Sequence, residues 1–193
     1  MGGKSGRRAS AFQTADCHEK TAVAFSAELS GPAGSRTGRR VGAVRHQTDR
    51  EKALALLDWT HRQWQHNGDN EPSRPDALTI LAEARTGRRF RCVEYATVLT
   101  SALQAVGYRA RSAALKTKDV ETARSGAGHV LVETWLPQFS KWVLLDGQYN
   151  VMPEAAGVPL NAVELGEALQ QRRAFGLFNQ AGEVRGANRT VYL

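Results

Sequence analysis

Residues 91–111 read RCVEYATVLTSALQAVGYRAR, and this stretch decides the fold. Over residues 93–106 the apolar side chains form a wide stripe at helical spacing, which predicts a largely buried helix that begins at about Cys92. Gly107 stands where the left-handed residue that ends a helix is expected. Residues 108–116 follow with the pattern of a strand. The stretch therefore predicts a buried helix that leads directly into a sheet.

Two shorter helices are expected before this stretch. Thr48 and Glu51 have the spacing of a capping box, which predicts that a first helix begins there, and the Asn-Gly pair at 67–68 is expected to end it. Pro75 fits the first turn of a second helix, and Gly87 fits its end. Both helices precede the predicted sheet.

The rest of the chain is expected to form most of the sheet. Residues 129–136 (HVLVETWL) and 141–149 (KWVLLDGQY) have the pattern of strands. Residues 150–160 contain a glycine and two prolines and are predicted to be a loop. An N-cap opens a predicted helix over residues 161–175, and the final TVYL is expected to be an edge strand. Helices, then a sheet, then a helix indicate an α+β fold rather than βαβ alternation.

Length and composition indicate one domain with a basic tail. The chain has 193 residues, enough for one compact domain and a tail. Residues 1–48 are rich in Gly, Arg and Ser, and we expect this tail to be disordered, because such a composition buries too little apolar surface. Residues 1–50 hold nine Lys and Arg against four Asp and Glu, and the rest of the chain is nearly balanced. A basic face for nucleic acid is therefore not indicated in the folded part.

The sequence also bears on compartment and on metals. No run of about 18 to 20 apolar residues is present, so no membrane helix is expected. Basic residues near the start have no apolar stretch behind them, so we expect a cytoplasmic protein without a secretory signal. The two cysteines, Cys17 and Cys92, form no CxxC pair, and neither a metal site nor a cofactor is predicted.

Three residues are candidates for catalysis, and each has a simpler explanation. Cys92 follows a polar segment and begins a helix, whose unpaired amides and dipole stabilise a thiolate, but a free cysteine is often a small buried apolar residue. His129 begins an alternating run after small residues, yet it could be a strand-end histidine bonded to the backbone. Asp146 ends the apolar run WVLLD, where a charge needs a partner, although aspartates often cap turns.

A hairpin would bring the histidine and the aspartate together. If residues 129–136 and 141–149 form a hairpin centred between Pro137 and Gln138, His129 lies directly opposite Asp146 on one face of the sheet. Other loop lengths remain possible, and a slip of one residue would separate the two side chains onto opposite faces. The symmetric register gives the pairing that a general base and the group that orients it require.

Three segments resemble those of the transglutaminase-like superfamily. The stretch 91–111 resembles its nucleophile segment, with a Cys, a buried helix, a glycine, an aromatic residue and a small residue followed by Arg at the start of a strand. GHVLVETWL at 128–136 resembles its histidine strand, and KWVLLD at 141–146 resembles its aspartate strand. The family often has Pro after the aspartate, whereas Gly147 stands here, and the sequence lacks the clustered carboxylates of calcium-dependent members.

The order of the segments makes the resemblance specific. Cys92 is followed after 37 residues by His129 and after 17 more by Asp146, as in the family. The resemblance covers about residues 75–150. It implies a papain-like α+β core within residues 49–193, in which the buried cysteine helix packs against an antiparallel sheet.

The resemblance implies a cysteine-dependent reaction on an amide. The Cys92 thiolate would attack a carboxamide or peptide carbonyl, and His129, oriented by Asp146, would protonate the leaving amine. The Cys92 amide would hold the oxyanion, with Gln63 or Trp64 as candidates for a second donor. Water would resolve the thioester in a thiol protease or other hydrolase, and an amine would resolve it in an acyltransferase. We expect hydrolysis of a peptide or protein amide.

Three other functions compete with this prediction. The segment CVEYA…GYRAR also resembles peptide N-glycanase-like deglycosylases, which usually carry paired CxxC motifs that this sequence lacks. A non-catalytic transglutaminase-like binding module is a second alternative, although all three residues of the triad are present. The basic tail leaves nucleic-acid binding as a third alternative, without a recognisable DNA- or RNA-binding motif.

Overall fold

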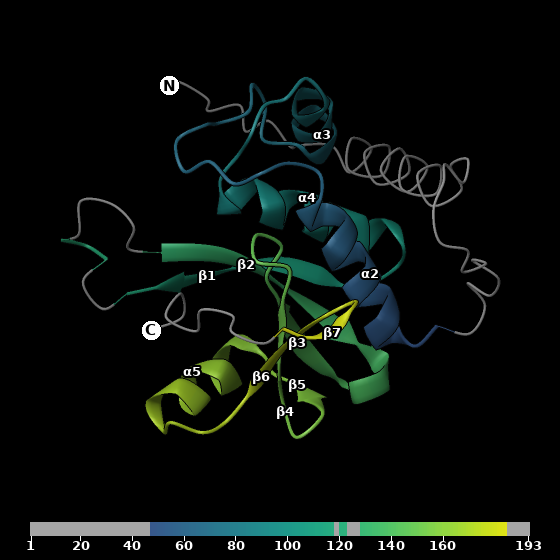
Figure 1. The fold of residues 1–193 in the computed structure, drawn as a ribbon, viewed down its shortest axis with the longest axis vertical. Helices are drawn as coiled ribbons and strands as arrows, with labels where there is room; N and C mark the ends of the chain where they lie inside the picture. The colour runs from purple at the N-terminus through teal and green to yellow at the C-terminus, as the bar shows by residue number, and fades with distance from the viewer. Residues whose placement is uncertain (1–46, 118–119, 123–127, 185–193) are drawn as a thin grey trace, which may run out of the picture.

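The computed structural model describes residues 47–117, 120–122 and 128–184 (Figure 1). Its helices are α2 (Asp49–His61), α3 (Ala77–Arg85), α4 (Cys92–Ala105) and α5 (Ala162–Gln170), with a short 3-10 helix, η2 (Pro137–Phe139). Its strands are β1 (Ala110–Lys116), β2 (Gly128–Leu136), β3 (Lys141–Leu145), β4 (Met152–Ala155), β5 (Val158–Pro159), β6 (Gly176–Asn179) and β7 (Gly182–Glu183). Both sheets are antiparallel, so the predicted α+β class is confirmed.

The central sheet, in the order β1-β2-β3, is covered on both faces (Figure 1). Val132 and Val143 point into a cluster formed with α2, α3 and α4. Leu131 and Leu144 point into a second cluster formed with α5 and the smaller sheet, whose order is β5-β4-β6-β7. Because successive strand residues point to opposite faces, burial of both faces explains the consecutive apolar residues at 130–132 in β2 and at 142–145 in β3.

Helix α4 is the buried helix that the sequence predicts. It packs against β1 and β2 and contacts α2 and α3. Its C-terminal turn is closed by Gly107 at a φ of 93°, with the Tyr108 amide donating to the Leu103 carbonyl at 3.0 Å. These bonds satisfy carbonyls that a helix end leaves unpaired, and they turn the chain into β1. The N-terminus of α4, with Cys92, is thereby held beside the sheet.

The predicted end of α2 is wrong. The capping box at Thr48 and Glu51 is present, but the helix ends at His61 rather than near the Asn-Gly pair at 67–68. Trp64, which continues the helical spacing, lies beyond the helix and packs against Phe90 and Tyr95. Its apolar character therefore reflects a tertiary contact, which periodicity alone cannot distinguish from a helical position.

Two other helix boundaries also differ from the prediction. Pro75 lies outside α3, because Asp76 is the N-cap and accepts the Thr79 amide at 2.9 Å. Helix α5 begins with the predicted N-cap, Asn161, but ends at Gln170 instead of near Phe175. Phe175 is buried in the second cluster, so packing rather than helix propensity fixes its place.

The prediction of a loop over residues 150–160 is wrong as well. Strands β4 and β5 form there, and β4 pairs with β6, which the sequence analysis did not predict. Pro153 lies within β4 and has no amide to donate, but its carbonyl accepts the Leu160 amide at 2.8 Å. Prolines normally indicate a turn or loop, so the local sequence predicts no strand here. The small sheet forms because β4 pairs with a strand that lies later in the chain.

Some expectations fall on residues that the structure does not describe. The disordered tail at 1–48 lies almost wholly outside the described residues, and the edge strand at TVYL lies wholly outside them. Across the described ranges, none of the helices has the length and apolar character needed to cross a membrane.

Candidate active site

Cys92 lies at the N-terminal end of α4 and is half-buried. The amide of Val93 interacts with the thiol from the same helix, and the amide of Val130 reaches it from β2. Both amides and the positive end of the helix dipole favour a negatively charged sulfur. Val130 was not among the residues that the sequence singled out, although it directly follows the candidate histidine.

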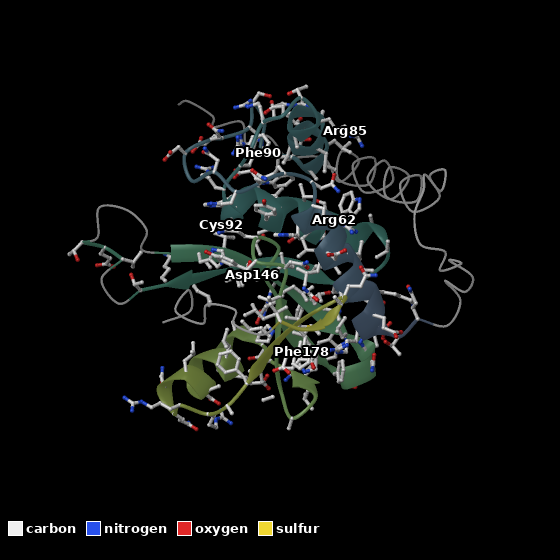
Figure 2. The ribbon with its side chains drawn as sticks, viewed as in Figure 1. Arg62, Arg85, Phe90, Cys92, Asp146 and Phe178 are labelled. Atoms are coloured by element: carbon white, nitrogen blue, oxygen red, sulfur yellow. The ribbon has the colours of Figure 1, made fainter. Side chains whose placement is uncertain are left out.

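His129 connects the sheet to this thiol. Its Nε2 lies 2.8 Å from Oδ2 of Asp146, and its side chain is 13% exposed. The imidazole also interacts with the Cys92 thiol, and each group shifts the pKa of the other. Because Nε2 faces the carboxylate, Nδ1 is the ring nitrogen left for the sulfur. Figure 2 shows the end of α4 that carries Cys92 beside the part of the sheet that carries Asp146.

Asp146 directly follows β3 and is completely buried. Its Oδ1 accepts the amides of Gln148 and Tyr149, both at 3.0 Å. Its backbone forms a bridge with Val151, where the two N···O distances are 2.9 and 3.2 Å. The carboxylate therefore caps the turn that follows β3 with one oxygen and holds the imidazole with the other.

The predicted hairpin register is wrong by two residues. Leu136 pairs with Lys141 and Val132 with Leu145, because η2 and Ser140, at a φ of 52°, occupy the connection. His129 is therefore not directly opposite Asp146. A shift of two residues leaves every side chain on its predicted face, since strand side chains alternate with a period of two. The two side chains still meet, through a diagonal contact instead of a direct pair.

The electrostatics of Cys92 and His129 favour opposite charges on the two groups. Burial by itself raises the pKa of the Cys92 thiol, but His129 and the two backbone amides outweigh it and hold that pKa below its ordinary value. Burial also opposes a charged imidazole, but hydrogen bonds with Asp146 and Cys92 outweigh it and raise the pKa of His129 to about 9. A thiolate beside an imidazolium is the state that these shifts favour.

Tyr149 is a neighbour of the site that the sequence analysis did not identify. Its ring centroid lies 5.5 Å from that of His129, and the residue is 44% exposed. Burial and the nearby charges of Asp146 and Cys92 raise the pKa of its phenol, so it is neutral at physiological pH. The only sequence signal was its position three residues after Asp146, in a stretch predicted to be strand.

Gly147 allows the turn after β3 to pack against α4. A Cβ atom at this position would lie 3.2 Å from Cβ of Tyr95 and 3.5 Å from its carbonyl oxygen. Tyr95 is itself held, because its hydroxyl donates to the Trp64 carbonyl at 2.7 Å. Proline also carries a Cβ, so the departure from the family pattern at this position has a steric reason.

The arginines before Cys92 have partners of their own. Arg91 forms ion pairs with Glu71 and with Glu94, the latter at 2.9 Å. Arg88 pairs with Glu83 at 2.5 Å. The positive potential expected from this segment is therefore partly neutralised, and His129 and the amides of Val130 and Val93 account for the lowered pKa of Cys92.

The two candidates for a second oxyanion donor differ in whether their donor group is already engaged. The Gln63 side-chain amide donates to the Trp59 carbonyl at 2.9 Å. The Trp64 ring packs 4.5 Å from the Tyr95 ring, and its buried Nε1 has no hydrogen-bond partner among the described residues.

Among the described residues, no group of three or more His, Cys, Asp and Glu is placed to hold a metal ion.

A half-buried thiol at a helix end, facing a histidine and an aspartate on a sheet, defines the class of cysteine enzymes with a papain-like α+β core. Within this class, the family model of the transglutaminase-like superfamily matches residues 38–147. The chain therefore belongs to the transglutaminase-like superfamily, as its three sequence segments suggested.

One solved structure is also similar to the chain. It is the crystal structure of a "putative cysteine protease" from Cytophaga hutchinsonii, with 15% sequence identity and a TM-score of 0.46. The match covers 70% of the present chain and 38% of the other, so the chain spans well under half of that protein's length. No curated protein is significantly similar in sequence.

Proposed function

We propose that the chain is a cysteine-dependent amidase of the transglutaminase-like type. Cys92 is the nucleophile, His129 is the general base and acid, and Asp146 orients the imidazole. The observation that carries this proposal is the position of His129, whose Nε2 lies 2.8 Å from the Asp146 carboxylate and whose imidazole also interacts with the Cys92 thiol. A nucleophile, a base and an orienting group in contact are what covalent catalysis requires.

The first half-reaction forms a thioester. The Cys92 thiolate attacks the carbonyl carbon of an amide, and the resulting oxyanion is stabilised by amides at the start of α4. As the C–N bond breaks, the His129 imidazolium donates its proton to the departing nitrogen. The products of this step are a free amine and an acyl group on the sulfur.

Water completes the reaction in the form that we favour. His129, now neutral, takes a proton from water as the oxygen attacks the thioester, and a carboxylic acid leaves while the sulfur is restored. Cys92 is only half-buried, so water has access to the thioester. An amine could take the place of water in the same step, which is the difference between hydrolysis and acyl transfer.

Reactivity of the thiol tests the proposal without knowledge of the substrate. In a Cys17→Ser background Cys92 is the only cysteine, and its rate of alkylation by iodoacetamide can be followed by mass spectrometry at about pH 6. We expect alkylation at least ten times faster than that of free cysteine, because a lowered pKa raises the thiolate fraction at this pH. The rate should fall in His129→Ala, and labelling should disappear in Cys92→Ala.

A slow reaction that is insensitive to His129→Ala would refute the proposal and favour a non-catalytic binding module. If the thiol is reactive, hydrolysis and acyl transfer are distinguished by assays with peptide, glutamine and glycan amides, with and without a primary amine. Release of glycan would instead favour the deglycosylase alternative.

A further inference from the structure

A cavity of about 620 Å³ lies between the end of α2, helix α4 and the turn that follows β3. Its aromatic lining comes from Trp64, Tyr95 and Tyr149, and His61 and Gln148 contribute polar groups. His61 also holds the turn, since its Nδ1 lies 3.0 Å from the Gln148 carbonyl oxygen. The volume is within the usual range for binding sites of small ligands, and aromatic walls with a few polar groups are their usual lining.

Tyr149 places this cavity beside the candidate catalytic histidine. One ring contributes to the cavity wall and also lies 5.5 Å from the imidazole of His129. In the proposed reaction His129 delivers its proton to the departing amine, so the amine and what it carries must lie on the histidine side of the scissile bond. The cavity adjoins that side.

The charge of the lining restricts what the cavity accepts. Among the described residues, the lining includes no Asp or Glu but does include Arg62, His61 and His66. Arg62 is already paired with Asp58 at 2.8 Å, so it adds little net charge. An ammonium group such as that of a lysine side chain would find no carboxylate among the lining residues that the structure describes. A planar apolar group would instead find the ring of Tyr149, which is 44% exposed, beside the more buried ring of Trp64.

We propose that this cavity binds an aromatic side chain on the leaving-group side of the scissile amide. This inference rests on the function proposed above and adds a substrate class to it. The cavity is then also where an amine nucleophile must sit to attack the acyl-enzyme, because deacylation by an amine is the reverse of acylation. Selectivity among amines therefore reports on the cavity.

The test uses partition of an acyl-enzyme. The full-length chain is acylated with p-nitrophenyl acetate, and the acetyl group is divided between water and an added amino acid amide. Phenylalaninamide, alaninamide and lysinamide present similar α-amines with different side chains. We expect phenylalaninamide to capture the acetyl group about tenfold better than alaninamide, and lysinamide to be no better than alaninamide. The ratio of acetylated amide to acetate does not depend on how fast the acyl-enzyme forms.

Variants of the cavity wall make the test specific. Tyr149→Ala should bring phenylalaninamide close to alaninamide, and Tyr149→Phe should keep the preference, because it keeps the ring. Val163→Ala, on the outer surface of α5 at 70% exposure, is the matched control and should change nothing.

The outcomes separate the two proposals. If no p-nitrophenol burst exceeds that of Cys92→Ala, the proposed function fails, and this inference fails with it. A normal burst with equal capture of the three amides, or a preference that survives in Tyr149→Ala, would refute the inference alone.

Discussion

At the scale of single residues, Asp146 has two tasks that depend on separate oxygens. Oδ1 accepts the amides of the following turn, and Oδ2 faces the imidazole of His129. The side chain is completely buried, so each oxygen acts away from water, where an electrostatic interaction is stronger. A substitution that preserves the turn but changes the second oxygen therefore tests the role of the charge.

Asp146→Asn is the substitution that separates the two tasks. Its amide oxygen can still accept the turn amides, so we expect the fold to persist. Its NH₂ group would donate to His129 Nε2 and stabilise the wrong tautomer, which should lower turnover on the order of 10⁴-fold. Circular dichroism checks the fold, and kcat/KM with whichever amide is found to be a substrate checks the chemistry. Full activity in a folded variant would contradict the role of Asp146.

The proposed roles of Cys92 and His129, together with their pKa shifts, predict how activity should depend on pH. Turnover needs the thiolate, whose pKa is lowered, and the imidazolium, whose pKa is raised to about 9. We therefore expect kcat/KM to rise as Cys92 loses its proton and to fall as pH passes about 9, where His129 loses its own. Alkylation needs only the thiolate, so its rate should not fall on the alkaline side. A parallel alkaline fall of both rates would contradict the assignment.

At the scale of elements, the turn after β3 connects three parts of the fold. Its Gln148 carbonyl oxygen lies 3.0 Å from Nδ1 of His61 at the end of α2, and its Gly147 packs against Tyr95 on α4. Figure 1 shows this turn rising from the sheet toward both helices. The position of Tyr149, and with it one side of the candidate site, therefore depends on how closely the turn approaches α4.

Gly147→Ala should loosen this approach. The new Cβ would lie 3.2 Å from Cβ of Tyr95. Tyr95 cannot move freely, because its hydroxyl donates a hydrogen bond to the Trp64 carbonyl. We expect a loss of about 1 to 2 kcal/mol in the free energy of unfolding and slower alkylation of Cys92. Gly166→Ala is the matched control, since Gly166 lies in α5 and a Cβ added there would meet no other part of the described chain within 4 Å. This change should raise the free energy of unfolding by about 1 kcal/mol, because alanine favours a helix more than glycine does. Urea unfolding measures both, and an equal effect of the two changes would contradict the steric argument.

At the scale of the whole molecule, one ion pair joins the helical part to the smaller sheet. Arg50 on α2 lies 2.5 Å from Glu154 on β4, and its guanidinium also lies 5.7 Å from the centre of the Phe178 ring on β6. The Glu154 side chain is 4% exposed and that of Arg50 is 28% exposed. The pair is thus largely removed from water, where loss of one partner is costly.

Glu154→Ala should destabilise the fold by about 2 to 3 kcal/mol, because it leaves the Arg50 charge without its partner in a mostly buried position. The pair of Arg62 and Asp58, in which the Arg62 side chain is 65% exposed, provides the comparison, and Arg62→Ala should cost about 0.5 kcal/mol. Urea midpoints with unchanged slopes measure the two effects. A loss in Glu154→Ala no larger than that in Arg62→Ala would show that the ion pair does not join the two parts energetically.

The sequence alone determined the elements whose signals are local. Spacing of apolar residues predicted the buried helix from Cys92 and the central strands. Side chains that satisfy free amides predicted the starts of α2 and α5, and Gly107 predicted the end of α4. The order of Cys92, His129 and Asp146 also indicated the family, which the family match supports. Their catalytic roles remain a proposal, which the contacts among them support.

Only the tertiary structure decided the features that depend on distant residues. Trp64 continues the helical spacing of α2, but its apolar contacts are with the distant residues Phe90 and Tyr95, so it lies outside the helix. Strand β4 was predicted to be a loop, because its partner strand β6 lies later in the chain. The register of β2 and β3 depends on the compact η2 connection, yet a shift of two residues preserves the face of every side chain. The pairing of His129 with Asp146 was therefore predictable from alternation, whereas the cavity bounded by Tyr149 was not, because its walls come from three separate elements.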